Sequence, residues 1–226
     1  MSATLITSAT FIPSATLITL VRHGKVAGPA ALYGKTDVPL STVGHSDLTR
    51  ALNNLHTQNP ITQLISSPKI RCLQVAQEFS TQQHIPLQTE DNLQEMDFGI
   101  WDGIPFDELG DEWKNIEAFW HTPDSMQPPQ GESLTEFATR IINSWEKLIS
   151  SNTPGHKVVV CHGGVIRILI AHILHLDWRN AALFKQLQID YASCTRIEIG
   201  DYENALPVIK WIGSPTNEET ASNICR

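Results

Sequence analysis

Two stretches of the chain are continuous apolar runs that end abruptly in histidine and glycine. "LITLVRHG" starts at Leu17 and "VVVCHGG" starts at Val158. Runs that are apolar at successive positions are typical of strands buried on both faces, as in parallel sheets covered by helices. The carboxyl ends of parallel strands meet at one edge of the sheet, where α/β proteins bind their ligands. We therefore expect such a sheet, with a site built on His23 and His162.

Helical patterns occupy the sequence around these runs. Residues 134–149 place apolar side chains on one helical face, and Ser133 and Glu136 have the spacing of a capping box. Further upstream, Ser67 and Pro68 are typical of an N-cap and a first helical residue. Strands that alternate with helices predict a three-layer α/β/α domain around a mostly parallel central sheet.

The length and composition favour a single domain. The chain has 226 residues, of which 41% are apolar, enough for one sizeable core. We assign the domain to residues 17–213 and a C-terminal tail to residues 214–226. Residues 1–16 are expected to be an N-terminal extension, because a short motif is repeated three times and only its third copy runs into the first strand. Residues 100–130, rich in Trp and Pro, predict a helical insert that caps the site.

The charge of the chain excludes several classes of partner. A formal net charge of -8 argues against binding to nucleic acid or to an anionic membrane, which both require an excess of Lys and Arg. The N-terminus has no basic residue before Arg22 and does not fit a secretory signal. The four cysteines form no CxxC pair, so we expect reduced thiols in a cytoplasmic protein.

Basic residues gather at the two strand ends and at the start of the helix after Pro68. In an acidic protein, their convergence indicates a pocket for an anion such as phosphate. Glycines at the same places let backbone N–H groups approach the anion without a Cβ in the way. The cationic candidates are Arg22, Lys25, Arg71 and His162, and the glycines are Gly24, Gly163 and Gly164.

Hydrolysis of a phosphate ester needs a nucleophile and a proton donor in addition to cations. A neutral imidazole at His23 can attack phosphorus in line and form a phosphohistidine that water later hydrolyses. Glu95 lies beside apolar residues in "LQEMDFGIWDG" and can donate the proton and then activate the water. Asp97 and Glu132 are rival carboxylates, and the sequence does not rank the three.

These residues resemble the signature of the histidine phosphatase superfamily, also called phosphoglycerate mutase-like. Five blocks match it in order: "LVRHGK", "YGKTDVPLSTVG", "ISSPKIRC", "LQEMDFGIWDG" and "VVVCHGGVIR". The resemblance implies the phosphoglycerate mutase-like fold and no metal or cofactor. It also implies that His23 is the phosphoacceptor, that Glu95 is the acid/base, and that Arg22, Arg71 and His162 line the phosphate pocket.

Within the superfamily the chain most resembles the α-ribazole-5'-phosphate phosphatases of cobalamin nucleotide-loop assembly. Sugar-phosphate or broad-specificity phosphatases, such as fructose-2,6-bisphosphatases, share many of these motifs and stay as an alternative. A catalytically silent phosphoprotein-binding module is the alternative outside enzymes. Lys25 and Val26 depart from the family, in which Glu or Gln and then Thr or Ser are common. The chain also lacks the Asn and the basic cluster of the mutases, which argues against a mutase.

The implied partner is a small-molecule phosphate monoester, with a homodimer as an option and no metal. Aromatic residues of the insert form a small core or stack on a flat substrate; they are Trp101, Trp113, Phe119 and Trp120. For Arg167, after the second His-Gly turn, the sequence favours a salt bridge within its own helix over contact with a ligand.

Overall fold

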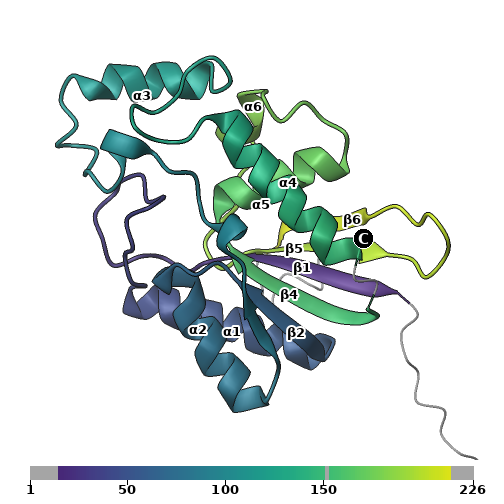
Figure 1. Cartoon of the computed structure of the whole chain (residues 1–226). Helices are drawn as coiled ribbons and strands as arrows, with labels where there is room; N and C mark the ends of the chain where they lie inside the picture. Colours follow the sequence, from purple (N-terminus) through teal and green to yellow (C-terminus); the bar gives the residue numbers. More distant parts are fainter. Residues whose placement is uncertain (1–14, 151–152, 215–226) are drawn as a thin grey trace, which may run out of the picture.

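A six-stranded sheet lies at the centre of the protein (Figure 1). The computed structural model describes residues 15–150 and 153–214. The sheet order is β3-β2-β4-β1-β5-β6. The strands are β1 (Thr16–Arg22), β2 (Ile61–Ser66), β3 (Leu87–Thr89), β4 (Gly155–Cys161), β5 (Cys194–Ile199) and β6 (Val208–Ser214).

Strands β1 to β4 are parallel to one another. At one side of the sheet, β5 pairs antiparallel with β1, and β6 pairs antiparallel with β5. β1 pairs with β4 without a bulge, and Arg22 lies opposite Cys161. The residues after these two, His23 and His162, are therefore brought together at the carboxyl edge. The predicted mostly parallel sheet is confirmed.

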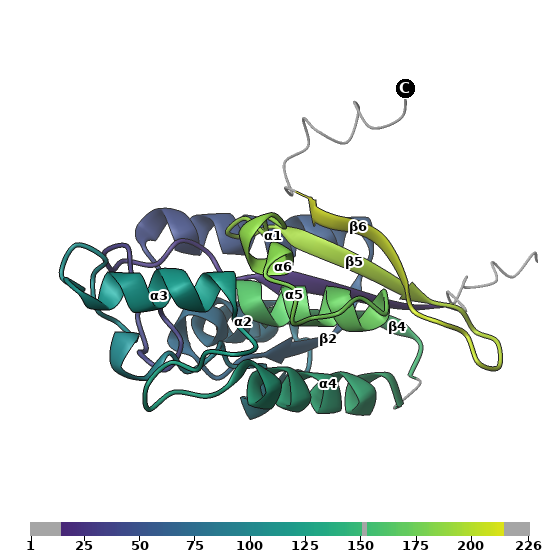
Figure 2. The same cartoon turned by 90° about the horizontal axis from the view of Figure 1, so that it is seen from above.

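Helices cover both faces of the sheet. Helices α1 (Thr42–Gln58) and α2 (Ile70–Gln83) lie on one face, and α4 (Leu134–Ser150) and α5 (Gly163–Ile173) lie on the other (Figures 1 and 2). Alternate side chains of a strand point to opposite faces. In β4, Val160 accordingly packs in the core under α1 and α2, and Val159 packs in the core under α4 and α5. The predicted three-layer architecture is confirmed.

The segment between the 3-10 turn η1 (Asp91–Leu93) and α4 contains the expected helical insert. It includes a second 3-10 turn, η2 (Gly99–Trp101), and helix α3 (Glu112–His121), which lies beyond the carboxyl edge of the sheet (Figure 2). A short helix, α6 (Ala182–Lys185), lies nearby. Trp101 and Phe119 are buried, and the indole N–H of Trp101 donates to Glu112 Oε2 at 2.9 Å. Both aromatic side chains belong to the hydrophobic core under α4 and α5 rather than to a separate core of the insert, and Trp113 is exposed.

The start of α2 differs from the prediction. The helix begins at Ile70 rather than at Pro68, and Ser67 is not its N-cap. The backbone N–H of Ile70 instead donates to Asp37 Oδ1 at 2.8 Å. Ser67 is fully buried, and its hydroxyl lies 2.8 Å from His162 Nε2. Its side chain serves the strand-end cluster rather than the helix.

The capping box of α4 is confirmed. Ser133 Oγ accepts a hydrogen bond from the backbone N–H of Glu136 at 3.2 Å, and Glu136 Oε2 accepts one from the backbone N–H of Ser133 at 2.8 Å. Residues Thr16 to Thr19 of the third N-terminal repeat lie in β1. The first two repeats, and the tail after Ser214, lie outside the described residues. No helix within residues 15–150 and 153–214 is long and apolar enough to cross a bilayer.

A buried histidine makes the stability of this fold depend on pH. His156 is held between Thr19 Oγ1 at 2.8 Å and the carbonyl oxygen of Asn59 at 2.9 Å, and burial lowers its pKa to about 4. In an unfolded chain the pKa is ~6.5. Between these values the unfolded chain binds a proton that the folded chain does not. The contribution to stability is therefore complete above pH ~6.5 and is lost as the pH falls toward about 4.

We predict that lowering the pH from 7 to 5 decreases the free energy of unfolding by about 2 kcal/mol more in wild type than in His156→Gln. Urea denaturation of both proteins at the two pH values measures this difference. Other buried histidines contribute to both proteins and cancel in the comparison. His84 is exposed, so His84→Asn serves as the control. Its free energy of unfolding should fall with pH by as much as that of wild type. Equal losses in wild type and His156→Gln would contradict the prediction.

Candidate active site

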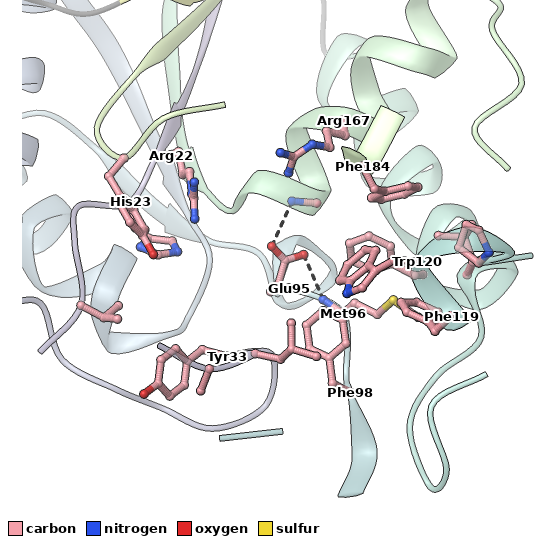
Figure 3. A pocket seen from close by; sticks show the side chains of 18 residues that line it. Arg22, His23, Tyr33, Glu95, Met96, Phe98, Phe119, Trp120, Arg167 and Phe184 are labelled. Carbon is pink, nitrogen blue, oxygen red and sulfur yellow. Dashed lines mark hydrogen bonds between the residues drawn. The ribbon is translucent and has the colours of Figure 1, made fainter. Parts of the chain in front are cut away.

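A cavity opens beyond the carboxyl ends of β1 and β4 (Figure 3). His23 and Arg22 line it from β1, Glu95 from the loop after η1, and Gly164 and Arg167 from α5. Aliphatic and aromatic side chains line the rest of the wall, and the aromatic ones are Phe98, Phe119, Trp120, Phe137, Phe184, Tyr33 and Tyr191. One part of the cavity is therefore charged and the other is apolar.

The ring of His23 is oriented by its own backbone segment. Its Nδ1 lies 2.8 Å from the carbonyl oxygen of Gly24. A carbonyl oxygen can only accept a hydrogen bond, so Nδ1 carries the proton and Nε2 has the free lone pair. The ring lies edge-on to His162, with centroids 5.2 Å apart, and 5.6 Å from the ring of Tyr191.

The imidazole of His23 is held in the neutral form. Burial lowers the pKa of His23 well below its usual value, and the charges of Arg71 and then Arg22 lower it further. The hydrogen bond to Gly24 opposes these effects. A neutral ring with an unprotonated Nε2 is the state that can act as a nucleophile.

Arg71 and His162 lie behind His23 rather than on the cavity wall. Both side chains are fully buried, and Arg71 Nε donates to His162 Nδ1 at 3.3 Å. His162 Nε2 then carries the proton and donates to Ser67 Oγ at 2.8 Å. Burial, followed by the charge of Arg71, lowers the pKa of His162 well below its usual value. Neither ring nitrogen of His162 is free for a ligand in this arrangement.

The rest of the Arg71 guanidinium holds the loop before α1. Its Nη2 donates to the carbonyl oxygen of Tyr33 at 2.7 Å and to that of Gly34 at 3.1 Å, and Nη1 donates to that of Thr36 at 3.0 Å. Arg71 thus connects the "YGKT" block to the strand-end histidines. Its charge still acts on His23 by lowering the pKa of that ring.

Arg22 lies on the wall of the cavity. Its Nη1 donates to the carbonyl oxygen of Ile189 at 2.6 Å, and its guanidinium stacks 3.9 Å above the ring of Tyr191. These two contacts fix the plane of the group. Its Nε is buried and has no hydrogen-bond partner among the described residues.

Glu95 is the carboxylate that faces the cavity (Figure 3). Its Oε2 accepts from the backbone N–H of Gly164 at 3.0 Å, and its Oε1 accepts from the N–H of Met96 at 3.1 Å. A Cβ at Gly164 would lie 2.3 Å from Oε1, so a side chain at this position would displace the Glu95 carboxylate. Arg140 of α4 holds the loop by donating to the carbonyl oxygens of Gln94 at 2.8 Å and Glu95 at 3.0 Å.

The two rival carboxylates have other partners and do not line the cavity. Glu132 receives both Nε and Nη2 of Arg140, at 3.0 and 2.6 Å. Asp97 Oδ1 accepts from the N–H of Gly99 at 2.9 Å. Of the three carboxylates left open by the sequence, the geometry favours Glu95.

Three other residues predicted for the site, Lys25, Gly24 and Gly163, are not among the residues that line the cavity. Lys25 is exposed. A Cβ at Gly24 would lie 1.9 Å from the carbonyl oxygen of Gly44, so Gly24 allows close packing of the strand end against α1. Gly163 allows the approach of arginine, since a Cβ there would lie 3.0 Å from Arg167 Nη1.

Sequence reasoning missed Arg167 and Arg140 as parts of this site. Arg167 makes no salt bridge within the described ranges and instead lines the cavity, and its Nε donates to the carbonyl oxygen of Leu187 at 2.9 Å. The signal was its position one turn after Gly163 and Gly164, on the helix that starts at the strand end. For Arg140 the sequence gives no signal, because its partners come from loops about 45 residues away.

No group of three His, Cys, Asp or Glu side chains in the described part of the chain is arranged to hold a metal ion. His172 of α5, three residues from His175, has its Nε2 2.9 Å from Glu146 Oε1.

Comparison with known proteins places the chain in a family. Residues 18–211 match the model of the histidine phosphatase superfamily (branch 1). The "Bifunctional protein Rv2228c" of Mycobacterium tuberculosis is 27% identical over 81% of this chain, which spans only 50% of that relative's length. The "Probable phosphoglycerate mutase GpmB" of Yersinia pestis is 25% identical, and the match covers 90% of this chain and 91% of that protein.

Solved structures share the fold. The alpha-ribazole phosphatase from Shigella flexneri superposes with a TM-score of 0.72 at 21% sequence identity, over 88% of this chain and 96% of that one. The match of the family model over most of the chain carries the assignment. The chain belongs to the histidine phosphatase superfamily, branch 1.

Proposed function

We propose that this protein is a phosphomonoesterase that works through a phosphohistidine on His23, with α-ribazole 5'-phosphate as its substrate. One observation carries the proposal. The unprotonated Nε2 of His23 shares a cavity with a guanidinium and a carboxylate, and the remaining wall of that cavity is mostly apolar and rich in aromatic rings. The family supports phosphoryl transfer, and the composition of the wall supports the choice of substrate.

In the first step, the Nε2 lone pair of His23 attacks phosphorus and the bond from phosphorus to the ester oxygen breaks. Glu95 gives its proton to the departing alcohol oxygen, so the alcohol leaves neutral. Arg22 neutralises charge on the phosphoryl oxygens during the transfer.

In the second step, Glu95 takes a proton from a water molecule as the water oxygen attacks phosphorus. The bond from Nε2 to phosphorus then breaks and inorganic phosphate leaves. His23 regains its lone pair. The two steps return His23 and Glu95 to their starting states, and neither step uses a metal ion or a cofactor.

The choice of substrate rests on the apolar wall. Trp120 lies with its ring centroid 4.9 Å from that of Phe119 and 5.9 Å from that of Phe184. Rings in this arrangement suit a flat aromatic base such as the benzimidazole of α-ribazole. The cations that line the cavity are Arg22 and Arg167, both at its charged part. A bisphosphate or a phosphoglycerate needs a further cation, which the aromatic part does not offer.

We also propose that the protein works in the cytoplasm. Cys72, Cys161 and Cys194 are buried free thiols, and thiols persist in reducing compartments.

The substrate assignment predicts a ranking of specificity constants. We expect kcat/KM for α-ribazole 5'-phosphate to exceed that for fructose 2,6-bisphosphate and for 3-phosphoglycerate by at least ~10-fold, because only the first carries a flat base. Trp120→Ala should lower kcat/KM about 10-fold for the first substrate only, since a stacked ring is lost. Trp113→Ala, an exposed tryptophan of the insert outside the cavity, is the matched control. A higher value for either of the other substrates would refute the assignment.

Removal of the nucleophile should abolish turnover. We predict that His23→Ala lowers kcat by about 10⁴-fold or more and that, unlike wild type, it forms no acid-labile adduct with radiolabelled substrate. The melting temperature of the variant shows whether it remains folded. Phosphohydrolase activity retained by folded His23→Ala would exclude His23 as the phosphoacceptor.

Loss of the proton donor should depend on the leaving group. Glu95→Gln is expected to lower kcat/KM by about 10²-fold or more for alkyl phosphates. A much smaller loss is expected for p-nitrophenyl phosphate, whose leaving group departs without a proton. Asp97→Asn, which keeps the acceptor oxygen for Gly99, is the control and should show neither loss. Equal losses of Glu95→Gln on both substrates would argue against the acid role.

A further inference from the structure

Arg167 faces the same part of the cavity as Arg22. Figure 3 shows its guanidinium directed from α5 toward the side on which Arg22 lies. Its Nε is occupied by the carbonyl oxygen of Leu187 at 2.9 Å, which fixes the orientation of the group. The two Nη groups are thereby turned toward the cavity.

The two guanidinium groups meet at Gly163. A Cβ at this glycine would lie 3.0 Å from Arg167 Nη1 and 3.4 Å from Arg22 Nε. Both nitrogens therefore border one small volume at the start of α5. Like charges brought this close repel each other, so the arrangement needs an explanation.

Neither arginine has an acidic partner. Within the described part of the chain, neither Arg22 nor Arg167 makes an ion pair. Arg22 Nε is buried without any hydrogen-bond partner among these residues, which is rare for a group that strongly favours one. Glu95, the carboxylate of the cavity, accepts instead from two backbone N–H groups.

Burial adds to the unfavourable energy of this pair. Burial lowers the pKa of Arg167, the charge of Glu95 raises it, and the charge of Arg22 lowers it by a smaller amount. Arginine nevertheless stays protonated in proteins, so both charges persist. An anion that accepts from both guanidinium groups would remove the repulsion.

We propose that Arg167 is a phosphate-binding residue that shares the phosphoryl group with Arg22. The proposal rests on the proposed function, because the anion is the phosphoryl group that His23 attacks. Guanidinium groups donate in a planar fork that matches phosphate oxygens. Arg71 directs four of its five N–H donors to loop carbonyls and to His162, so it also positions the residues around His23.

The test measures anion binding separately from turnover. Calorimetric titrations with inorganic phosphate and with orthovanadate are compared for wild type, Arg167→Gln and Arg167→Lys. We expect Arg167→Gln to weaken binding of both anions by roughly 10- to 100-fold, the range for one lost charge-assisted hydrogen bond, and Arg167→Lys to restore part of it. A purely structural role would change the melting temperature without changing the anion affinity of the folded protein.

Arg179→Gln is the matched control, because Arg179 is an exposed arginine that pairs with Asp124 and lies outside the cavity wall. It should keep wild-type affinity for both anions.

Folded Arg167→Gln with wild-type affinities would overturn the inference and leave the proposed hydrolysis standing. Weakened binding in Arg167→Gln, together with wild type that hydrolyses no monoester, would support the anion site and overturn the hydrolysis. Wild type that binds neither anion would overturn the site itself.

Discussion

The in-register pairing of β1 with β4 is the constraint on which the site depends. Every residue from Thr16 to Arg22 pairs with a residue of β4, and the pairing ends with Arg22 opposite Cys161. Because side chains alternate along a strand, a slip of one residue would exchange the faces of either strand and move His23 out of line with His162. The apolar cores on both faces fix this register, since Val159 and Val160 must enter opposite cores.

That pairing explains the chemical state of the two histidines. It places them side by side, at the point where Arg22 and Arg71 also arrive. Burial and the two positive charges both disfavour a protonated ring, so the pKa of each histidine is lowered. Their hydrogen bonds then select different tautomers. His23 keeps Nε2 free, whereas His162 uses both ring nitrogens within the protein.

Local patterns and strand ends predicted the layers of the fold, whereas contacts between distant segments could not be predicted from the sequence. The buried runs, the capping box of α4 and the sheet-edge position of His23 all arise from periodicity. The start of α2 does not, because Asp37 caps it from 33 residues away. Lys25 lies two residues past His23 yet is exposed, since the chain leaves the sheet after Gly24 to pass α1. Arg167 faces the cavity because Leu187, from a later segment, fixes its guanidinium.

The cavity therefore has a charged part and an apolar part, and neither arrangement is explained by the stability of the fold alone. At one part, the half-buried Arg22 and Arg167 lie close together and make no ion pair among the described residues, which opposes folding through repulsion and desolvation. At the other, aromatic rings such as Trp120 and Phe184 line a space instead of filling it. Such unfavourable arrangements persist where the surrounding structure holds them in place. Here the two packed cores and the uninterrupted pairing of β1 with β4 do so. A ligand that carries an anionic group next to a flat apolar group would complement both parts at once.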